Sequence, residues 1–158
     1  MKPFAALAVA AGLALGHAGL AAAADYRVAD DSDRGLGLVD ADSIVAVGDA
    51  RRLQFVAVLK DGDQDSFNVL VSRVLLDCAG ARYRIEEVDV FDLEMNYLTR
   101  ETGDPDQTRW SPALPDSPFT PTADFACRGK ALPRPATQDL KTLANDYAER
   151  RRGQERVV

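Results

Sequence analysis

Histidine and cysteine are the scarcest reactive residues in this chain: one histidine and two cysteines among 158 residues. The histidine, His17, lies in an N-terminal segment that we expect to be removed, so the mature chain would have none. Its absence removes Ser-His-Asp and Cys-His catalysis and histidine as a zinc ligand. We therefore expect no enzyme, no metal and no cofactor. A histidine-free hydrolase that uses two facing carboxylates stays open as an alternative.

The N-terminal segment, residues 1–24, has the layout of a secretory signal peptide. Lys2 supplies a positive charge, an apolar run follows from Phe4 to Leu15, and small residues accumulate at 21–24. The alternative is a membrane anchor, but glycines interrupt a run that is already short for the ~20 apolar residues of a span. We expect cleavage after Ala24, a soluble mature chain, and a place in the periplasm or at the cell surface.

Charge is divided unevenly along the remaining 134 residues, a length that suits one domain. Residues 25–129 hold 11 basic and 21 acidic residues, a net charge of −10. Residues 130–158 hold 7 basic and 4 acidic residues, a net charge of +3. An acidic body argues against a nucleic-acid partner, because phosphates need a basic face. The basic tail either contacts an anionic surface or is simply solvated.

From Tyr26 the pattern is typical of β-structure. The hydrophobic alternation predicts strands at 36–39, 43–47, 52–60, 67–77, 82–92 and 93–99, with a possible bulge near Ser72–Arg73. Short connections, among them a Gly48–Asp49 turn, make successive strands antiparallel neighbours. The segment therefore predicts an antiparallel β-sheet meander.

Two helical patterns follow the strands. Thr120 as N-cap, Pro121 at the first position and Gly129 just past the end predict a short helix. Residues 137–152 form a second pattern, whose narrow apolar stripe is Leu140, Leu143, Ala144 and Tyr147. This second segment is either a frayed tail helix or a helix for docking or dimerisation. The expected fold class is α+β.

The two cysteines, Cys78 and Cys127, are interpreted as one disulfide, because exported chains meet an oxidising compartment. Such a bridge closes a loop of about 50 residues and contributes about 4 kcal/mol in the chain-entropy model. It would tether the short helix to the sheet. The alternative is a free or catalytic thiol; no C-x-x-C spacing supports an oxidoreductase.

Acidic clusters offer weaker candidates for chemistry. The spacing of Asp61, Asp63 and Asp65 matches the first three ligands of an EF-hand calcium-binding loop. That loop also requires a glycine at its sixth position and a glutamate at its twelfth, and this chain has serines at both. Residues 30–33, "DDSD", match less well. Glu94, Glu101, Asp104 and Asp106 could supply paired carboxylates, although solvated charge explains them equally. Trp110, the single tryptophan, is either core packing or an exposed interface anchor.

Five short motifs occur along the chain in this order: "VDADSI", "LLDCAGARYRI", "VDVFD", "WSPALPDSP" and "FACRG". Together they resemble the surface-adhesin protein E family of Gram-negative bacteria, over residues 26–129. The resemblance implies an exported, non-enzymatic binding domain in which Cys78 and Cys127 occupy the positions of a disulfide. It also implies a protein partner, either extracellular or in the envelope, and is compatible with a homodimer. A structural or stress-related envelope protein without a dedicated ligand is the alternative.

Overall fold

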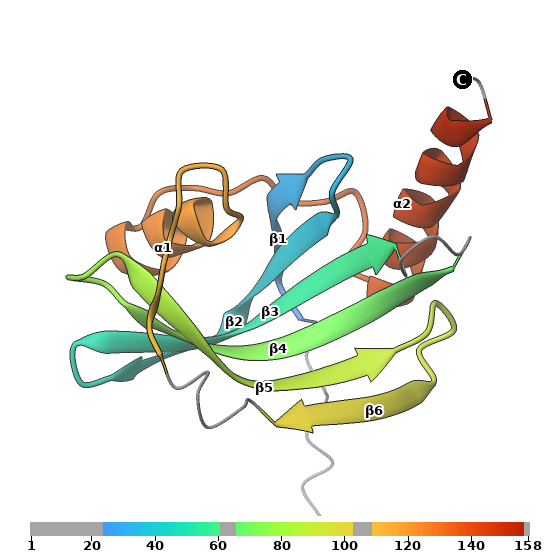
Figure 1. The fold of residues 1–158 in the computed structure, drawn as a ribbon. Helices are drawn as coiled ribbons and strands as arrows, with labels where there is room; N and C mark the ends of the chain where they lie inside the picture. Colours follow the sequence, from blue (N-terminus) through green and yellow to red (C-terminus); the bar gives the residue numbers. More distant parts are fainter. Residues whose placement is uncertain (1–23, 61–65, 103–108, 157–158) are drawn as a thin grey trace, which may run out of the picture.

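A computed structural model describes residues 24–60, 66–102 and 109–156. These residues form an antiparallel sheet and two helices (Figure 1). The strands are β1 (Tyr26–Asp31), β2 (Leu36–Val47), β3 (Ala50–Lys60), β4 (Phe67–Asp77), β5 (Arg82–Phe91) and β6 (Tyr97–Thr102). They lie side by side in chain order, and β7 (Ser111–Pro112) pairs with the start of β5. The predicted α+β meander is confirmed.

The region 36–47 is a single strand, β2, where the sequence pattern predicts two. Its pairing with β3 shifts between Asp40 and Val45, so that four residues of β2 lie opposite Leu53. Ser43 compensates for the interrupted ladder, because its Oγ accepts a hydrogen bond from the backbone N–H of Gln54 at 2.7 Å. The "VDADSI" motif is therefore a bulge whose missing backbone acceptor is replaced by a side chain.

A second irregularity lies in β5 and not in β4. The sequence predicts a bulge near Ser72–Arg73, but β4 pairs with β3 without interruption from Phe67 to Asp77. Between β4 and β5, Arg73 lies opposite Glu87, while Val74 lies opposite Ile85. The extra residue is therefore Glu86, in β5.

The two helices, α1 (Phe119–Arg128) and α2 (Leu140–Glu155), pack at opposite ends of the sheet (Figure 1). Alternation along β3 shows that they also cover opposite faces. Leu53 and Phe55 belong to the cluster beneath α1, whereas Val56 and Val58 belong to the cluster beneath α2. Because side chains alternate in a strand, these pairs point to different faces. Each helix covers part of one face and leaves the rest of that face without a helix.

The helix α1 is tethered as predicted. A disulfide joins Cys127, near the end of α1, to Cys78, which follows β4, with the two Cα atoms 5.6 Å apart. The helix begins at Phe119, slightly before the predicted start, with Pro118 in the N-cap position. Gly129 ends it with a positive φ of 67°, a left-handed conformation that suits glycine.

The C-terminal helix α2 docks on its own sheet. Its buried residues are Leu143, Ala144, Tyr147 and Ala148. The hydroxyl of Tyr147 donates a hydrogen bond to the backbone carbonyl of Ser32 at 2.9 Å. Neither helix in the described part of the chain is long and apolar enough to span a membrane.

Candidate functional site

The half of the sheet face that α2 leaves uncovered carries mainly charged and polar side chains, with Val45 at its margin. We call it the polar face: Arg52, Gln54, Arg73, Arg84, Glu86, Glu87, Asp89 and Arg100. Arg73 follows Phe67, Val69 and Val71 at two-residue steps along β4, so it lies on the same face as the core beneath α2. One sheet face therefore changes from an apolar, helix-covered half to a charged, open half.

Ion pairs connect the charges of the polar face into two groups. In the first, Arg100 contacts Asp89 at 2.6 Å and Glu87 at 3.2 Å, and Glu87 also contacts Arg73 at 3.3 Å. In the second, Glu86 accepts from Arg52 at 2.8 Å. The bulge in β5 explains the arrangement, because its extra residue allows two consecutive glutamates to reach arginines on the same face.

The ion pairs also set the ionisation of these carboxylates. The hydrogen bond from Arg100 is the main reason why the pKa of Asp89 is lowered. The hydrogen bond from Arg52 likewise lowers the pKa of Glu86. A general acid needs the opposite, a carboxyl group whose pKa is raised by an apolar pocket. These carboxylates are thus suited to holding arginines in place rather than to donating protons.

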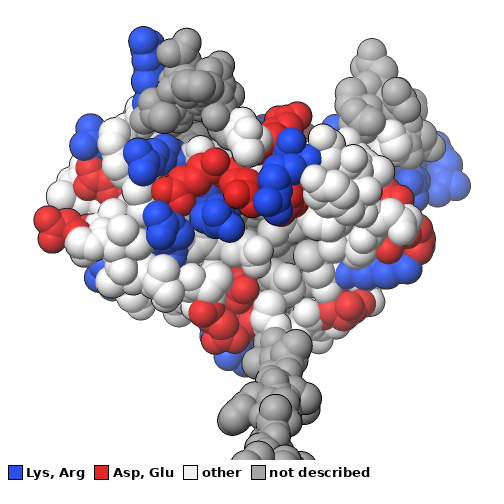
Figure 2. All heavy atoms as spheres, turned by 90° about the horizontal axis from the view of Figure 1, so that it is seen from below, with Lys and Arg blue, Asp and Glu red and all other residues white. Residues whose placement is uncertain are grey.

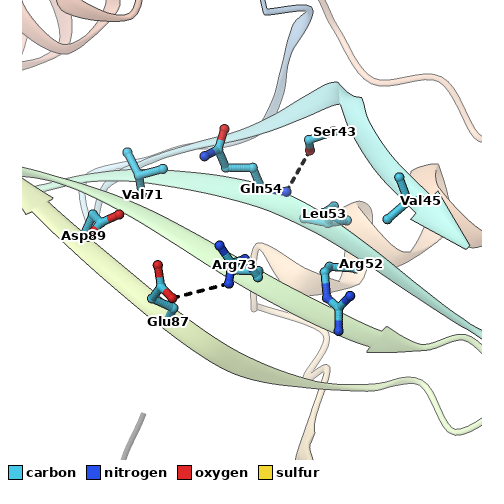
Figure 3. Close-up of a pocket in the computed structure, with 9 residues that line it drawn as sticks. All are labelled: Ser43, Val45, Arg52, Leu53, Gln54, Val71, Arg73, Glu87 and Asp89. Atoms are coloured by element: carbon cyan, nitrogen blue, oxygen red, sulfur yellow. Dashed lines mark hydrogen bonds and ion pairs between the residues drawn. The ribbon is translucent and has the colours of Figure 1, made fainter. Parts of the chain in front are cut away.

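A shallow groove of about 240 Å³ runs across the polar face. Figure 3 shows the side chains that line it, which come from β2, β3, β4 and β5; Ser43 and Val45 form its margin on β2. The surface view in Figure 2 shows basic and acidic side chains lying next to one another in a band on the side of the molecule that it draws. The groove is a mixed-charge surface and not a patch of one sign.

Trp110 lies at the edge of the polar face, next to its arginines. It directly precedes β7, which pairs with Arg82 and Tyr83 of β5. The guanidinium carbons of Arg82 and Arg84 lie 5.0 Å and 5.4 Å from the centre of the indole ring. Trp110 is half-buried and does not belong to either core cluster of the described residues. It therefore packs on charged side chains and keeps part of its surface open.

A second open surface, the apolar groove, lies on the opposite face, beside the start of α1. Its volume is about 410 Å³. Its apolar walls are Phe55, Ala57, Leu59, Tyr83, Leu114, Pro118 and Phe119, with Gly35 just before β2 and Gly37 within it. Asp30, Arg34 and Asp116 supply the charges at its margin.

Most of the other acidic candidates are not brought together. Glu94 lies between β5 and β6 and forms an ion pair with Lys141 of α2 at 2.5 Å. Glu101 lies near the other end of β6, opposite Val88. Asp61, Asp63, Asp65, Asp104 and Asp106 lie outside the described residues. Within the described ranges no group of three or more histidine, cysteine, aspartate or glutamate side chains could hold a metal ion.

The sequence reasoning missed both open surfaces, although β5 carries a signal for the first. In "RYRIEEVDVF" the charged residues Arg84, Glu87 and Asp89 occupy one side of an alternating strand, with a slip at the bulge. A charged side of a central strand predicts a sheet face that no helix covers. The apolar groove has no comparable signal, because its walls come from four separate segments: residues 35–37, β3, β5 and residues 114–119.

The chain matches the family model described as surface-adhesin protein E over residues 27–128. The match starts within β1 and ends with the last residue of α1, so it includes the sheet, the disulfide and both open surfaces. The helix α2 lies outside it. No curated protein and no solved structure matches the chain.

Proposed function

We propose, from the premise that this chain belongs to the surface-adhesin protein E family, that it is an exported, non-enzymatic protein of the bacterial cell envelope that binds another protein. Family membership makes it adhesin-like; the partner's class and the absence of catalysis are our inference. The signal-peptide pattern of residues 1–24 and the disulfide support export, since disulfides persist in oxidising compartments. Periplasm and outer surface are both compatible with these features.

The observation that carries the proposal is the open, ion-paired polar face. An isolated domain has no need to hold several arginines and carboxylates in fixed positions on half of a sheet face, since exposed ion pairs contribute little to stability. Fixed charges of both signs do favour one orientation of a charged partner and suppress wrong partners. Trp110, held at the edge by Arg82 and Arg84, supplies the aromatic surface that interface anchors commonly provide.

The chemistry of the polar face supports binding over hydrolysis. Glu87 and Asp89 line the groove together, but both are paired with Arg100, whose hydrogen bond lowers the pKa of Asp89. A carboxylate hydrolase requires one protonated member of such a pair. The proposed activity is therefore recognition without bond breakage.

The test places a photo-cross-linking side chain at Gln54, exposed within the groove, in the mature protein expressed in its own envelope. A matched position is Asp49, exposed at the turn between β2 and β3. We expect a discrete protein adduct from Gln54 and none from Asp49, which mass spectrometry would identify. An equal pattern from both positions would rule out the polar face as the binding surface.

A charge variant then tests the ion pairs themselves. Arg100→Ala removes a cation of the polar face, and we expect it to weaken the adduct by about fivefold or more. The exchanged pair Arg100→Asp with Asp89→Arg keeps an ion pair at the same place and serves as the folding control. If Arg100→Ala leaves the adduct unchanged, the polar face does not recognise the partner through its charges.

A further inference from the structure

The apolar groove differs from the polar face in both its walls and its rim. Phe119 stacks against Tyr83, with ring centres 3.8 Å apart, and lies 4.9 Å from the ring of Phe55. These rings form one wall. On the open side, Leu114 keeps 60% of its surface exposed and Leu59 keeps 37%. Exposed leucines that border a hollow of this size are typical of a contact surface.

Two glycines allow side chains of β3 to lie close against the backbone at the floor of the groove. A Cβ atom on Gly37 would lie 2.9 Å from Cζ of Phe55 and 3.4 Å from Cβ of Pro118. A Cβ atom on Gly35 would lie 2.5 Å from Cδ2 of Leu59. Both glycines are therefore buried, and the β3 side chains Leu59 and Phe55 lie directly over their backbone. The volume of about 410 Å³ leaves room for a side chain of another molecule.

The rim of the groove is acidic. Asp30 stands on the β1 side and Asp116 on the loop before α1. Arg34, the one basic lining residue in the described part of the chain, donates a hydrogen bond to the backbone carbonyl of Asp116 at 3.0 Å and so connects the two sides. Asp33, which directly precedes Arg34, is exposed and adds a negative charge to the turn between β1 and β2. Of the "DDSD" segment, Asp30 lines the groove, whereas Asp31 pairs with Arg150 of α2.

We infer that the apolar groove is a second docking site, which takes a basic segment of a protein partner, with an aliphatic or aromatic side chain inserted between flanking lysines or arginines. The apolar walls would contact the inserted side chain, and the carboxylates of the rim would attract the basic side chains that flank it. The net charge of −10 over residues 25–129 also favours association with a basic partner. This inference rests on the proposed function in one respect, that the partner is a protein.

The test uses the mature protein and a capped six-residue peptide, a phenylalanine–leucine pair with two lysines on each side, labelled for fluorescence anisotropy. One control peptide has glutamates in place of the lysines, and another has serines in place of the apolar pair. We expect the lysine peptide to bind at least about tenfold more tightly than either control, because both the walls and the rim contribute. Added salt should reduce the ratio between the affinities for the lysine peptide and the glutamate peptide.

Matched variants locate the site. Leu114→Ser should weaken peptide binding by about fivefold or more, whereas Leu98→Ser, a leucine of β6 with 53% exposure, should leave it unchanged. Leu59→Ser and Val47→Ser form a second pair, each residue being 37% exposed. Asp116→Asn should weaken binding at low salt by about twofold, and Asp49→Asn should not.

Several outcomes would overturn the inference. The first is an equal loss of affinity for the lysine peptide in Leu114→Ser and Leu98→Ser. The second is an equal affinity of the protein for the lysine and glutamate peptides, and the third is no binding at millimolar peptide. The protein could also self-associate in a way that Leu114→Ser abolishes and that the peptide does not inhibit. That result would assign the groove to a second copy of the chain. Cross-linking through Gln54 is measured separately, so failure at the apolar groove leaves the polar face standing, and the reverse holds too.

Discussion

The two helices are attached to the same sheet by different kinds of interaction. The disulfide at Cys127 holds the end of α1, and the stacked rings of Phe119 and Tyr83 hold its start. The helix α2 has no cysteine, and it is held by a narrow apolar stripe and by exposed ion pairs, among them Lys60 with Glu155. One helix is covalently fixed at its end, and the other is held by noncovalent contacts.

The difference follows the boundary of the family match. The match ends with the last residue of α1, while α2 lies beyond it and covers Val56, Val58 and Phe67. The core beneath α2 is therefore completed by a segment outside the shared domain. We expect the two ends of the sheet to differ in stability, and three predictions test this contrast from the largest effect to the smallest.

The largest effect should come from removing the disulfide. The double variant Cys78→Ala and Cys127→Ala should lower the free energy of unfolding by about 4 kcal/mol, because the unfolded chain gains the freedom of a loop of 49 residues. Amide exchange should rise mainly in α1. Chemical denaturation and hydrogen exchange measure both quantities. An equal rise in α2 would contradict the independence of the two helices.

The next effect concerns the apolar stripe of α2. Leu143→Ala should lower the free energy of unfolding by about 3 kcal/mol, because it leaves a cavity beneath the helix. Exchange should rise in α2 while α1 keeps its protection. The control is Lys141→Ala on the exposed side of the same helix, with an expected effect below about 1 kcal/mol. A uniform loss of protection across the sheet would show that both ends unfold together.

The smallest effect should be the response to acid. Asp139, the N-cap of α2, accepts hydrogen bonds from Thr142, which lower its pKa. Lys60 likewise lowers the pKa of Glu155. A carboxylate with a lowered pKa in the folded state stabilises the fold above its ordinary value of about 4. This contribution is lost as the pH falls below that value.

In α1, the hydrogen bond from Lys130 lowers the pKa of Asp124 in the same way, but this helix keeps its disulfide, which does not titrate. Acidification from pH 7 to pH 3 should therefore loosen α2 before α1. Protection factors for the amides of the two helices, measured at both values and corrected for intrinsic exchange, test this order. Asp139→Asn removes one of the two titrating groups and should make the loosening of α2 less steep. Earlier loosening of α1 would contradict the contrast between the helices.

Strands with strong alternation were the most predictable elements. The pattern predicts a strand at 67–77, and β4 has these bounds. The last strand is shifted, however: the pattern predicts 93–99, whereas β6 begins at Tyr97. Asp92 explains the shift, because its carboxylate accepts from the N–H groups of Glu94 and Asn96 and holds a turn there. Such a hydrogen-bonded turn has no signature in the hydrophobic pattern of the sequence.

The candidate site was less predictable than the fold. Trp110 stands out in the sequence as the single tryptophan, but its position against Arg82 and Arg84 depends on the pairing of β7 with β5. Whether it acts as an interface anchor stays a prediction. The polar face joins Arg52, Arg73 and Arg100 from three strands, and only the register of the sheet places each of them beside a carboxylate of β5.

The sequence by itself determined the antiparallel meander, the two helices and the pairing of Cys78 with Cys127, because alternation, capping residues and cysteine count act locally or leave a single partner. The tertiary structure decided which face each helix covers, and therefore which surfaces stay open. That outcome depends on the twist of the sheet, the extra residue Glu86 and the docking of α2. These are long-range packing relations, in which segments far apart in the chain compete for the same apolar surface.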